Sequence, residues 1–383
     1  MATRRRKARE IAVGNVGIGG NNPISIQSMT NIATKNVSAS VGQIRELVET
    51  GCEIVRMAVT NLEDVKSFAA IRDVLRSQGI SVPLVADVHF SPIIAAHCLK
   101  VADKVRINAG NFSDKILGQK EFSDGEFMVE KLKLREKLKS FFSLAKNENK
   151  PVRIGINHGS LAPRMIYKFG NSEAAMWESA RECLEAAEEV HFDSIVLSFK
   201  SSDAGKMVAI NRLACSQMDK IGWNFPLHLG VTESGSGDYA RTKSAIGIGT
   251  LLLDGLGDTI RVSLTEDPPG EIGVAKNILQ ACGARRFTAE IIACPSCGRT
   301  SYNIQAVLGK IKCSIGQLET AKNLKIAVMG CAVNGIGEAG DADFAIVGNG
   351  NGTLSIYSGN VPVLKNISQE EICEKFLKII KNT

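Results

Sequence analysis

The sequence predicts an α/β protein of two domains: a (β/α)₈ barrel over residues 1–285 and a smaller α+β domain over residues 286–383. Through about residue 285, short β-rich runs alternate with amphipathic helical runs, which predicts a parallel sheet. Eight such units in about 260 residues predict a closed TIM barrel. The alternation then stops, and a cysteine pair opens a segment with a different rhythm.

The expected strands of the barrel span residues 24–31, 53–60, 83–88, 104–109, 152–157, 194–200, 226–232 and 259–264. The expected helices between them span residues 41–50, 62–77, 92–101, 174–190, 206–221, 243–253 and 270–282. The alternative is an open doubly wound sheet, which would normally carry a glycine-rich phosphate loop after its first strand. The segment Ser28–Asn31 at that place is not such a loop.

Two further regions depart from the repeating pattern. The fourth connection, residues 111–150, is long, and residues 126–139 within it predict an exposed, charge-laced helix that packs against the barrel. The second domain is expected to contain a helix near 304–318, a strand at 325–330, a glycine-rich turn, strands near 344–347 and 353–357, and a last helix at 369–381.

Composition narrows the class of protein. Of 383 residues, 44% are hydrophobic and 22% charged, which is typical of a globular enzyme. No apolar run approaches the ~18 residues that a membrane span needs. The basic N-terminus, residues 1–10, lacks the apolar stretch of a secretory signal, so we expect a cytoplasmic protein and treat this arm as a solvated tail or a contact to a neighbouring subunit. The net charge of +6 is spread along the chain and favours acidic small molecules over nucleic acid.

Basic residues recur on the expected strands of the barrel. They are Arg56, Arg106, Arg153, Lys200 and Arg261. Barrel enzymes work at the C-terminal ends of their strands, and five cations at one mouth would repel one another unless an anion lies between them. Guanidinium groups bind phosphate in a bidentate manner, so the pattern predicts a substrate with more than one phosphate charge. Asn157 and Ser263 could complete this cradle.

Three of the ten cysteines have the surroundings of ligands. Cys294 and Cys297 flank a proline and a serine, and Cys331 enters a glycine-rich stretch that also carries Glu338. No histidine follows His228, which excludes a Cys₃His zinc site within the second domain. Three thiolates with one carboxylate suit an iron–sulfur cluster, while a zinc site and a redox pair remain open alternatives. The other cysteines are expected to fill the core.

Several ordered motifs together resemble one family, the hydroxymethylbutenyl diphosphate synthases, iron–sulfur enzymes of the methylerythritol phosphate route to isoprenoids. The motifs are Ile24–Asn31, Pro83–Phe90, Arg106–Asn111, Arg153–Asn157, His228–Glu233, Gly257–Ser263, Ala293–Cys297 and Gly330–Glu338. The match extends over essentially the whole chain. Only about 26 residues separate Pro268 from Cys294, so the chain resembles the two-domain form of these enzymes rather than the three-domain plant form.

The resemblance implies a barrel followed by an iron–sulfur (reductase-like) domain, in a homodimer where the cluster domain of one subunit caps the barrel of the other. It implies a [4Fe-4S] cluster held by Cys294, Cys297, Cys331 and Glu338, with Asn334 facing it. The cradle residues named above would bind the diphosphate of the substrate. Ala109 and Ile336 stand where the family usually has proline, and we expect each to loosen a loop without removing a ligand.

The implied reaction is a two-electron reductive dehydration and ring opening. The substrate would be 2-C-methyl-D-erythritol 2,4-cyclodiphosphate, the product 4-hydroxy-3-methylbut-2-enyl diphosphate, and the electron donor a ferredoxin or flavodoxin. Glu338 would be a replaceable ligand, and Glu233 would supply or relay a proton. The residues by themselves also allow Glu233 to be a strand-end carboxylate paired with a basic residue, and His89 to be either a hydrogen-bonding partner of the site or a core histidine.

Two rival functions remain at this point. One is a phosphate-handling barrel enzyme, of the aldolase or pterin-transferase type, with a structural zinc knuckle. The other is a nucleic-acid module built on the basic arm and the cysteines, although the chain shows no basic patch rich in aromatic residues.

Overall fold

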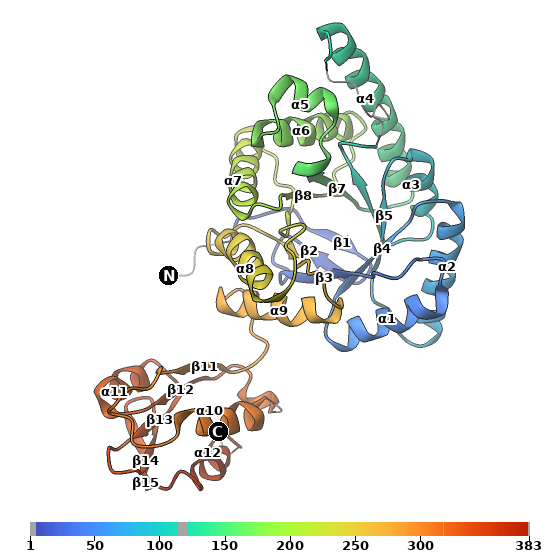
Figure 1. Cartoon of the computed structure of the whole chain (residues 1–383). Coiled ribbons are helices and arrows are strands. Elements are labelled where there is room, and N and C mark those ends of the chain that lie inside the picture. Colours follow the sequence, from blue (N-terminus) through green and yellow to red (C-terminus); the bar gives the residue numbers. More distant parts are fainter. Residues whose placement is uncertain (1–4, 113–120, 317, 382–383) are drawn as a thin grey trace. The chain divides into compact units, whose positions relative to one another are not determined.

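The computed structural model describes residues 5–112, 121–316 and 318–381. The chain forms two compact units, Met1–Arg285 and Arg286–Thr383 (Figure 1). Within the described residues, no helix combines the length and the apolar character required to cross a bilayer.

The first unit is a nearly closed parallel barrel, as the sequence predicts. Its strands are β3 (Ser25–Met29), β4 (Ile54–Ala58), β5 (Leu84–Val88), β6 (Lys104–Asn108), β7 (Val152–Asn157), β8 (Ile195–Lys200), β9 (His228–Leu229) and β10 (Thr259–Ile260). They pair in the order β8-β7-β6-β5-β4-β3-β10-β9, and a parallel bridge from Leu197 to Leu227 joins the two ends. This topology excludes the open doubly wound sheet.

Helices surround the barrel (Figure 1). They are α1 (Val37–Glu49), α2 (Leu62–Ser77), α3 (Pro92–Cys98), α4 (Asp124–Asn147), α5 (Pro163–Phe169), α6 (Glu173–Glu189), α7 (Ala204–Ile221), α8 (Gly237–Leu253) and α9 (Pro269–Ala281), with a short 3₁₀ turn η1 (His158–Ser160). The predicted helix in the long connection is present as α4. Its start is fixed by a capping box, in which Ser123 and Glu126 bond reciprocally to each other's backbone.

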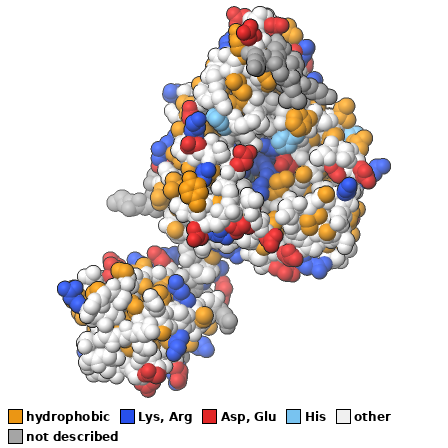
Figure 2. All heavy atoms as spheres, viewed as in Figure 1, with side chains coloured by type: hydrophobic (Ala, Val, Ile, Leu, Met, Phe, Trp, Pro, Cys, Tyr) orange, Lys and Arg blue, Asp and Glu red, His pale blue; other side chains and the backbone are white. Residues whose placement is uncertain are grey.

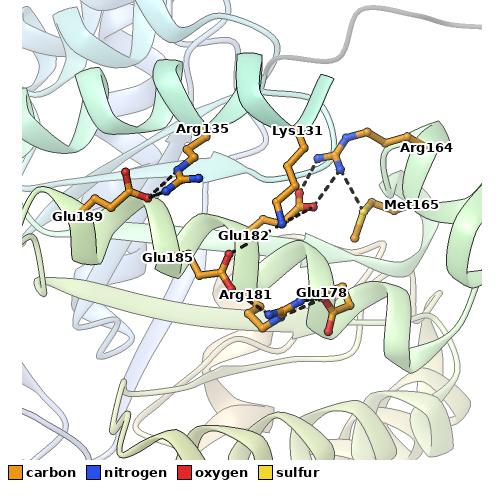
Figure 3. Close-up of polar contacts among 9 residues, drawn as sticks. All are labelled: Lys131, Arg135, Arg164, Met165, Glu178, Arg181, Glu182, Glu185 and Glu189. Carbon is orange, nitrogen blue, oxygen red and sulfur yellow. Dashed lines mark hydrogen bonds and ion pairs between the residues drawn. The ribbon is translucent and has the colours of Figure 1, made fainter. Parts of the chain in front are cut away.

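Charged side chains join α4 to the neighbouring helices (Figure 3). Arg135 of α4 pairs with Glu189 of α6, and Lys131 lies 3.9 Å from Glu182 of α6. The buried guanidinium of Arg164, in α5, bonds Glu182 at 2.6 Å. Buried residues of α4 such as Phe142 supply the apolar contact beneath these pairs. The charges predicted from the sequence thus hold α4 beside α6.

A β-hairpin that we did not predict from the sequence closes the end of the barrel at which the strands begin. Strands β1 (Ile11–Val13) and β2 (Val16–Ile18) are antiparallel, and three of their side chains cluster with those of three barrel strands. The members of this plug are Ile11, Val13, Ile18, Ile54, Val85 and Val196. Each hairpin strand has only three residues, which is too short for a periodic signal.

The basic arm packs on the barrel of its own chain. Arg5 pairs with Asp258 at 2.5 Å, Arg6 with Asp219 at 2.9 Å, and the Arg9 guanidinium lies 4.2 Å from the centre of the Phe225 ring. The expectation of a solvated tail is therefore wrong for this part of the arm, because acidic and aromatic partners lie close by on the barrel, while the expected contact to a neighbouring subunit stays a prediction. Residues 1–4 of the arm lie outside the described residues.

The second unit is built on one five-stranded sheet. Its strands β11 (Glu290–Ala293), β12 (Lys325–Met329), β13 (Phe344–Gly348), β14 (Leu354–Ser358) and β15 (Val361–Ile367) lie in that order, parallel through β13 and antiparallel after it. Helices α10 (Ile304–Ile315) and α12 (Ile372–Lys381) cover one face, and α11 (Ala332–Gly340) packs on the other; η2 (Glu319–Ala321) is a short turn. The sequence reading missed β11 and β15.

The glycine-rich segment after β12 is a helix and not the turn that we expected. Alternate residues of β12 and β13, such as Ala327 and Val347, present a flat face to this helix. A Cβ added at Gly335 would lie 2.6 Å from Val347 Cγ1. The glycine therefore allows α11 to pack closely on the sheet. Glycine-rich composition alone does not distinguish such a helix from a turn.

Candidate functional site

The predicted strand cations converge inside the barrel of the first unit. Arg56, Arg106, Arg153 and Lys200 are buried on four strands, and Arg261 follows β10 directly, with a partly exposed side chain. Figure 2 shows Lys and Arg side chains at the bottom of a hollow in this unit. Four of the five basic side chains are thus almost fully buried. Such burial is expected for side chains that bind an anion and not for charges on the surface.

Glycines on neighbouring strands make room for these long side chains. A Cβ at Gly155 would lie 2.5 Å from Arg106 Nε, and one at Gly230 would lie 2.9 Å from Lys200 Nζ. Both glycines therefore face the barrel interior beside a cation. Any larger residue at either position would displace the charge that it faces.

Two buried carboxylates, which the sequence reading did not single out, partly neutralise the cations. Arg106 Nη1 donates to Asp87 Oδ1 at 2.9 Å, and Arg56 Nε lies 3.5 Å from Asp87 Oδ2. Arg261 donates through Nε and Nη2 to Glu271, both at 3.3 Å. Asp87 lies near the end of the expected strand at 83–88, so its position could have indicated the site. Glu271, in the first turn of α9, gave no such signal.

Arg153 and Lys200 form no ion pair with another described residue, and Arg106 keeps one nitrogen without a partner there. Arg153 Nε and Nη1 and Arg106 Nε are buried and lack a hydrogen-bond partner there. Burial, followed by repulsion from Arg56 and Arg106, holds the pKa of Arg153 well below its usual value. Burial likewise lowers the pKa of Lys200 and brings the pKa of Arg56 to about 9. The site therefore carries an excess of positive charge that an anionic ligand would relieve.

His89 belongs to this site and is not a core histidine. Arg106 Nη1 contacts His89 Nε2 within hydrogen-bond distance, and the side-chain nitrogen of Asn111 lies 3.2 Å from His89 Nδ1. Burial and the charge of Arg106 lower the pKa of His89 to about 4. The imidazole is therefore neutral near pH 7 and fixes the orientation of Arg106.

The other predicted barrel residues lie at the carboxyl ends of the strands. Asn157 is the last residue of β7, and Ser263 follows Arg261 by two positions. Glu233 is exposed, has the left-handed φ of +54°, and forms no ion pair with another described residue. A non-glycine residue in this conformation is strained, and such strain gathers at functional sites. The alternative role of Glu233 was that of a strand-end carboxylate paired with a basic residue. Within the described part of the chain, no basic side chain pairs with it.

The three predicted cysteine ligands line one cavity of about 170 Å³ in the second unit. Cys294 follows β11, Cys297 begins a turn closed by the bond from Thr300 N to Cys297 O, and Cys331 is the N-cap of α11. Gly330 N donates to Cys294 Sγ at 3.1 Å, a contact of the kind that stabilises cluster thiolates. Asn334 also lines this cavity. The donor set therefore fits an iron–sulfur group.

Glu338 is placed differently from the three thiols. It is exposed on α11, two turns after Cys331, and it is not among the residues that line the cavity. No three His, Cys, Asp or Glu side chains within the described ranges already form a closed set of metal ligands. Of the remaining cysteines, Cys52, Cys98, Cys183 and Cys215 are buried, whereas Cys313 is exposed on α10.

Comparison with known proteins assigns the chain to a family. The model of the GcpE TIM-barrel domain matches residues 8–276, and that of the GcpE protein C-terminal domain matches residues 290–382. The chain belongs to the GcpE family. Among curated GcpE relatives, the 4-hydroxy-3-methylbut-2-en-1-yl diphosphate synthase (ferredoxin) of Prochlorococcus marinus is 46% identical over 381 residues, covering 99% of this chain and 93% of the relative. The enzyme of the same name from Parasynechococcus marenigrum is 46% identical over 380 residues, covering 98% and 94%.

The family assignment confirms the resemblance found in the motifs. As a GcpE protein, the chain is an oxidoreductase of isoprenoid precursor biosynthesis with a TIM barrel. Among solved structures, the dihydropteroate synthase of Vibrio fischeri is 14% identical with a TM-score of 0.46, covering 72% of this chain and 98% of that one. A likeness of this size carries no functional argument, so it does not support the pterin-transferase alternative.

Proposed function

We propose that this GcpE protein converts 2-C-methyl-D-erythritol 2,4-cyclodiphosphate to 4-hydroxy-3-methylbut-2-enyl diphosphate. The conversion takes up two electrons and one proton: the bond from carbon to the ring phosphate oxygen breaks, the neighbouring hydroxyl leaves as water, and a carbon–carbon double bond forms. The observation that carries the proposal is the excess of buried cations in the barrel, which suits a ligand with two fixed phosphate charges.

The cradle for the diphosphate consists of Arg56, Arg106, Arg153, Lys200 and Arg261, together with Asn157 and Ser263. Asp87 and Glu271 hold Arg106 and Arg261 in place. Two nitrogens of Arg153 have no hydrogen-bond partner among the described residues and would bind phosphate oxygens. Because these groups are ordered before the ligand arrives, little side-chain entropy is lost on binding. The barrel is therefore the substrate-binding domain of this proposal.

Cys294, Cys297 and Cys331 would hold a [4Fe-4S] cluster, with Glu338 as its replaceable fourth ligand. When bound, the cluster supplies the two electrons and a Lewis-acidic iron. Cys331 is the N-cap of α11 and therefore lies at the positive end of this helix. For Glu338 to serve as a ligand, α11 has to present it toward the three sulfurs, and Asn334 on the same helix would lie beside the cluster.

Glu233 is the group placed to move the proton. It is exposed at the carboxyl end of the barrel after β9 and has no competing ion pair among the described residues. In the proposal it protonates the departing hydroxyl oxygen, so that water rather than hydroxide leaves. The left-handed backbone at this residue is of the strained kind that gathers at functional sites.

The partners follow from the same proposal. The names of the relatives specify ferredoxin, which supports ferredoxin as the electron donor of this chain, and flavodoxin would be the alternative. We further propose a homodimer in the cytoplasm in which the cysteine domain of one subunit serves the barrel of its partner. Exposed apolar side chains next to the carboxyl ends of the barrel strands, Phe90, Ile93 and Tyr239, support such a covering partner.

Metal analysis of protein purified without oxygen tests this assignment against the zinc alternative. The proposal predicts about four irons per chain and a broad brown absorption in the visible range that is bleached by a reductant. A colourless protein with one zinc per chain would instead support a phosphate-handling barrel enzyme with a zinc knuckle.

A further inference from the structure

A second layer of polar side chains lies inside the barrel, beneath the cradle. Five residues stand two positions before a residue of the cradle layer. In three of these pairs both residues lie in one strand and so point to the same side, and in the other two the second residue directly follows the strand. They are Gln27, Lys104, Ser198, His228 and Thr259, which precede Met29, Arg106, Lys200, Gly230 and Arg261. Met29 belongs to the cradle layer because its sulfur accepts from Arg56 Nε at 3.2 Å.

Every member of this layer is buried without a hydrogen-bond partner. The unpaired atoms are Gln27 Oε1 and Nε2, Lys104 Nζ, Ser198 Oγ, both ring nitrogens of His228, and Thr259 Oγ1, where partners are counted within the described residues. All five side chains are 0–1% exposed. Unpaired buried polar groups cost free energy, so a layer of five requires an explanation beyond packing.

The charges around Lys104 and His228 are all positive. Arg153 and Arg56 act on Lys104, and Arg153, Lys200, Lys104 and Arg56 act on His228. Burial first, and then these cations, hold the pKa of each group well below its usual value. Asp87 and Glu271, the carboxylates of the site, are bonded instead to Arg106 and Arg261. Without a bound anion, burial and the surrounding cations therefore disfavour the charged forms of Lys104 and His228.

We propose that Lys104 and His228 form a second cationic layer of the diphosphate site, which becomes charged by taking up protons when the cyclic diphosphate binds. The inference rests on the proposed function, because it requires the substrate phosphates to lie on Arg153 and Lys200. Two negative charges there offset part of the positive charge above this layer and so favour protonation of Lys104 and His228. Lys104 and His228 are then positioning residues, which act on the substrate through the arginines above them.

The substrate makes a clean probe of this linkage. Each phosphorus of 2-C-methyl-D-erythritol 2,4-cyclodiphosphate has one ester bond and one anhydride bond. Each phosphate therefore carries one fixed negative charge near neutral pH, and any proton taken up on binding goes to the protein. Calorimetric titration of the oxidised holoenzyme without a reductant, in buffers of different ionisation enthalpy, counts these protons. We expect between about one and two per substrate bound near neutral pH, with affinity falling about tenfold per pH unit for each proton.

Lys200 and His89 could also take up protons when the substrate binds. Variants of Lys104 and His228 show how much of the uptake belongs to the second layer. Lys104→Met and His228→Phe remove unpaired polar atoms and keep the volume, so both are expected to fold. Each should lower the proton count by at least about half a proton and flatten the pH dependence of the dissociation constant. Lys100→Met, which alters an exposed lysine, is the control and should leave both unchanged.

The outcomes distinguish the two proposals. If the substrate binds to wild type without proton uptake, the second layer plays no electrostatic part and the inference is overturned. The same holds if both variants bind more weakly by a constant factor at every pH with an unchanged proton count, since that is the behaviour of a purely structural layer. If the substrate does not bind wild type at all, the proposed function itself fails.

Discussion

Asp87 bridges Arg106, at 2.9 Å, and Arg56, at 3.5 Å, within the barrel. It thereby holds two cations from neighbouring strands side by side at the mouth of a site that has more positive than negative charge. The position of this carboxylate explains how the cradle can exist before any ligand binds. Replacing it should therefore affect stability as well as function.

We predict that Asp87→Asn lowers the free energy of unfolding at pH 7 by about 3 kcal/mol, because two buried guanidinium groups lose their counter-ion. The charges of Arg56 and Arg106 hold the pKa of Asp87 below its usual value despite its burial. A depressed pKa contributes stability above the unfolded value of about 3.9 and loses it as the pH falls below that value. Urea titrations should thus show wild type and variant converging below about pH 4.

The matched control is Asp254→Asn, which breaks the surface pair with Arg212. The free energy of unfolding of this variant should fall by less than about 1 kcal/mol at pH 7. Equal losses for the two variants would contradict the role assigned to Asp87.

Arg153→Met should separate binding from stability. Its guanidinium is buried and has two unpaired nitrogens, so replacing it with an apolar side chain should raise the free energy of unfolding by about 1–2 kcal/mol. The same change removes bidentate phosphate contacts and should weaken substrate binding by about 10–100-fold. Thermal unfolding and calorimetry measure the two effects, with the exposed Arg212→Met as control. A variant that is less stable yet binds normally would show that Arg153 is structural.

The ligand set can be tested by iron content. We expect Cys294→Ser, Cys297→Ser and Cys331→Ser each to lose most of the iron and the visible absorption, because the three thiols line one cavity. Cys313→Ser, at an exposed position of α10, should retain both. In Glu338→Ala the three cysteines would still bind the cluster, but the iron that Glu338 would bind should be lost more readily. Unchanged iron retention and turnover in Glu338→Ala would remove this residue from the ligand set.

Glu233 offers a test of chemistry against backbone strain. Glu233→Gln should lower kcat by about 10²–10⁴-fold while iron content and substrate affinity persist. Glu233→Gly should lose activity equally but raise the free energy of unfolding by about 1 kcal/mol, because glycine accepts the φ of +54°. Glu233→Ala keeps the strain and should show no such gain. Normal turnover in the glutamine variant would refute the proton-transfer role.

The sequence predicted the barrel because eight repeated units leave a periodic signal, and it placed the strand cations because parallel strands end at one mouth. Asp87 was missed although it lies near the end of an expected strand, whereas Glu271, in the first turn of a helix, occupies no distinctive position in the sequence. The β9 and β10 strands proved only two residues long, because pairing ends where the chain turns into the site. The glycine-rich helix α11 was misread because close packing and tight turns both select glycine.

The central claim is that the barrel cations and the cysteine centre serve one reductive reaction. The most direct test is product formation by anaerobic holoenzyme supplied with reduced ferredoxin and 2-C-methyl-D-erythritol 2,4-cyclodiphosphate. The account predicts one 4-hydroxy-3-methylbut-2-enyl diphosphate for every two electrons consumed, and loss of this product in both Arg153→Met and Cys331→Ser. An iron-loaded wild-type enzyme that binds the substrate but forms no such product would contradict it.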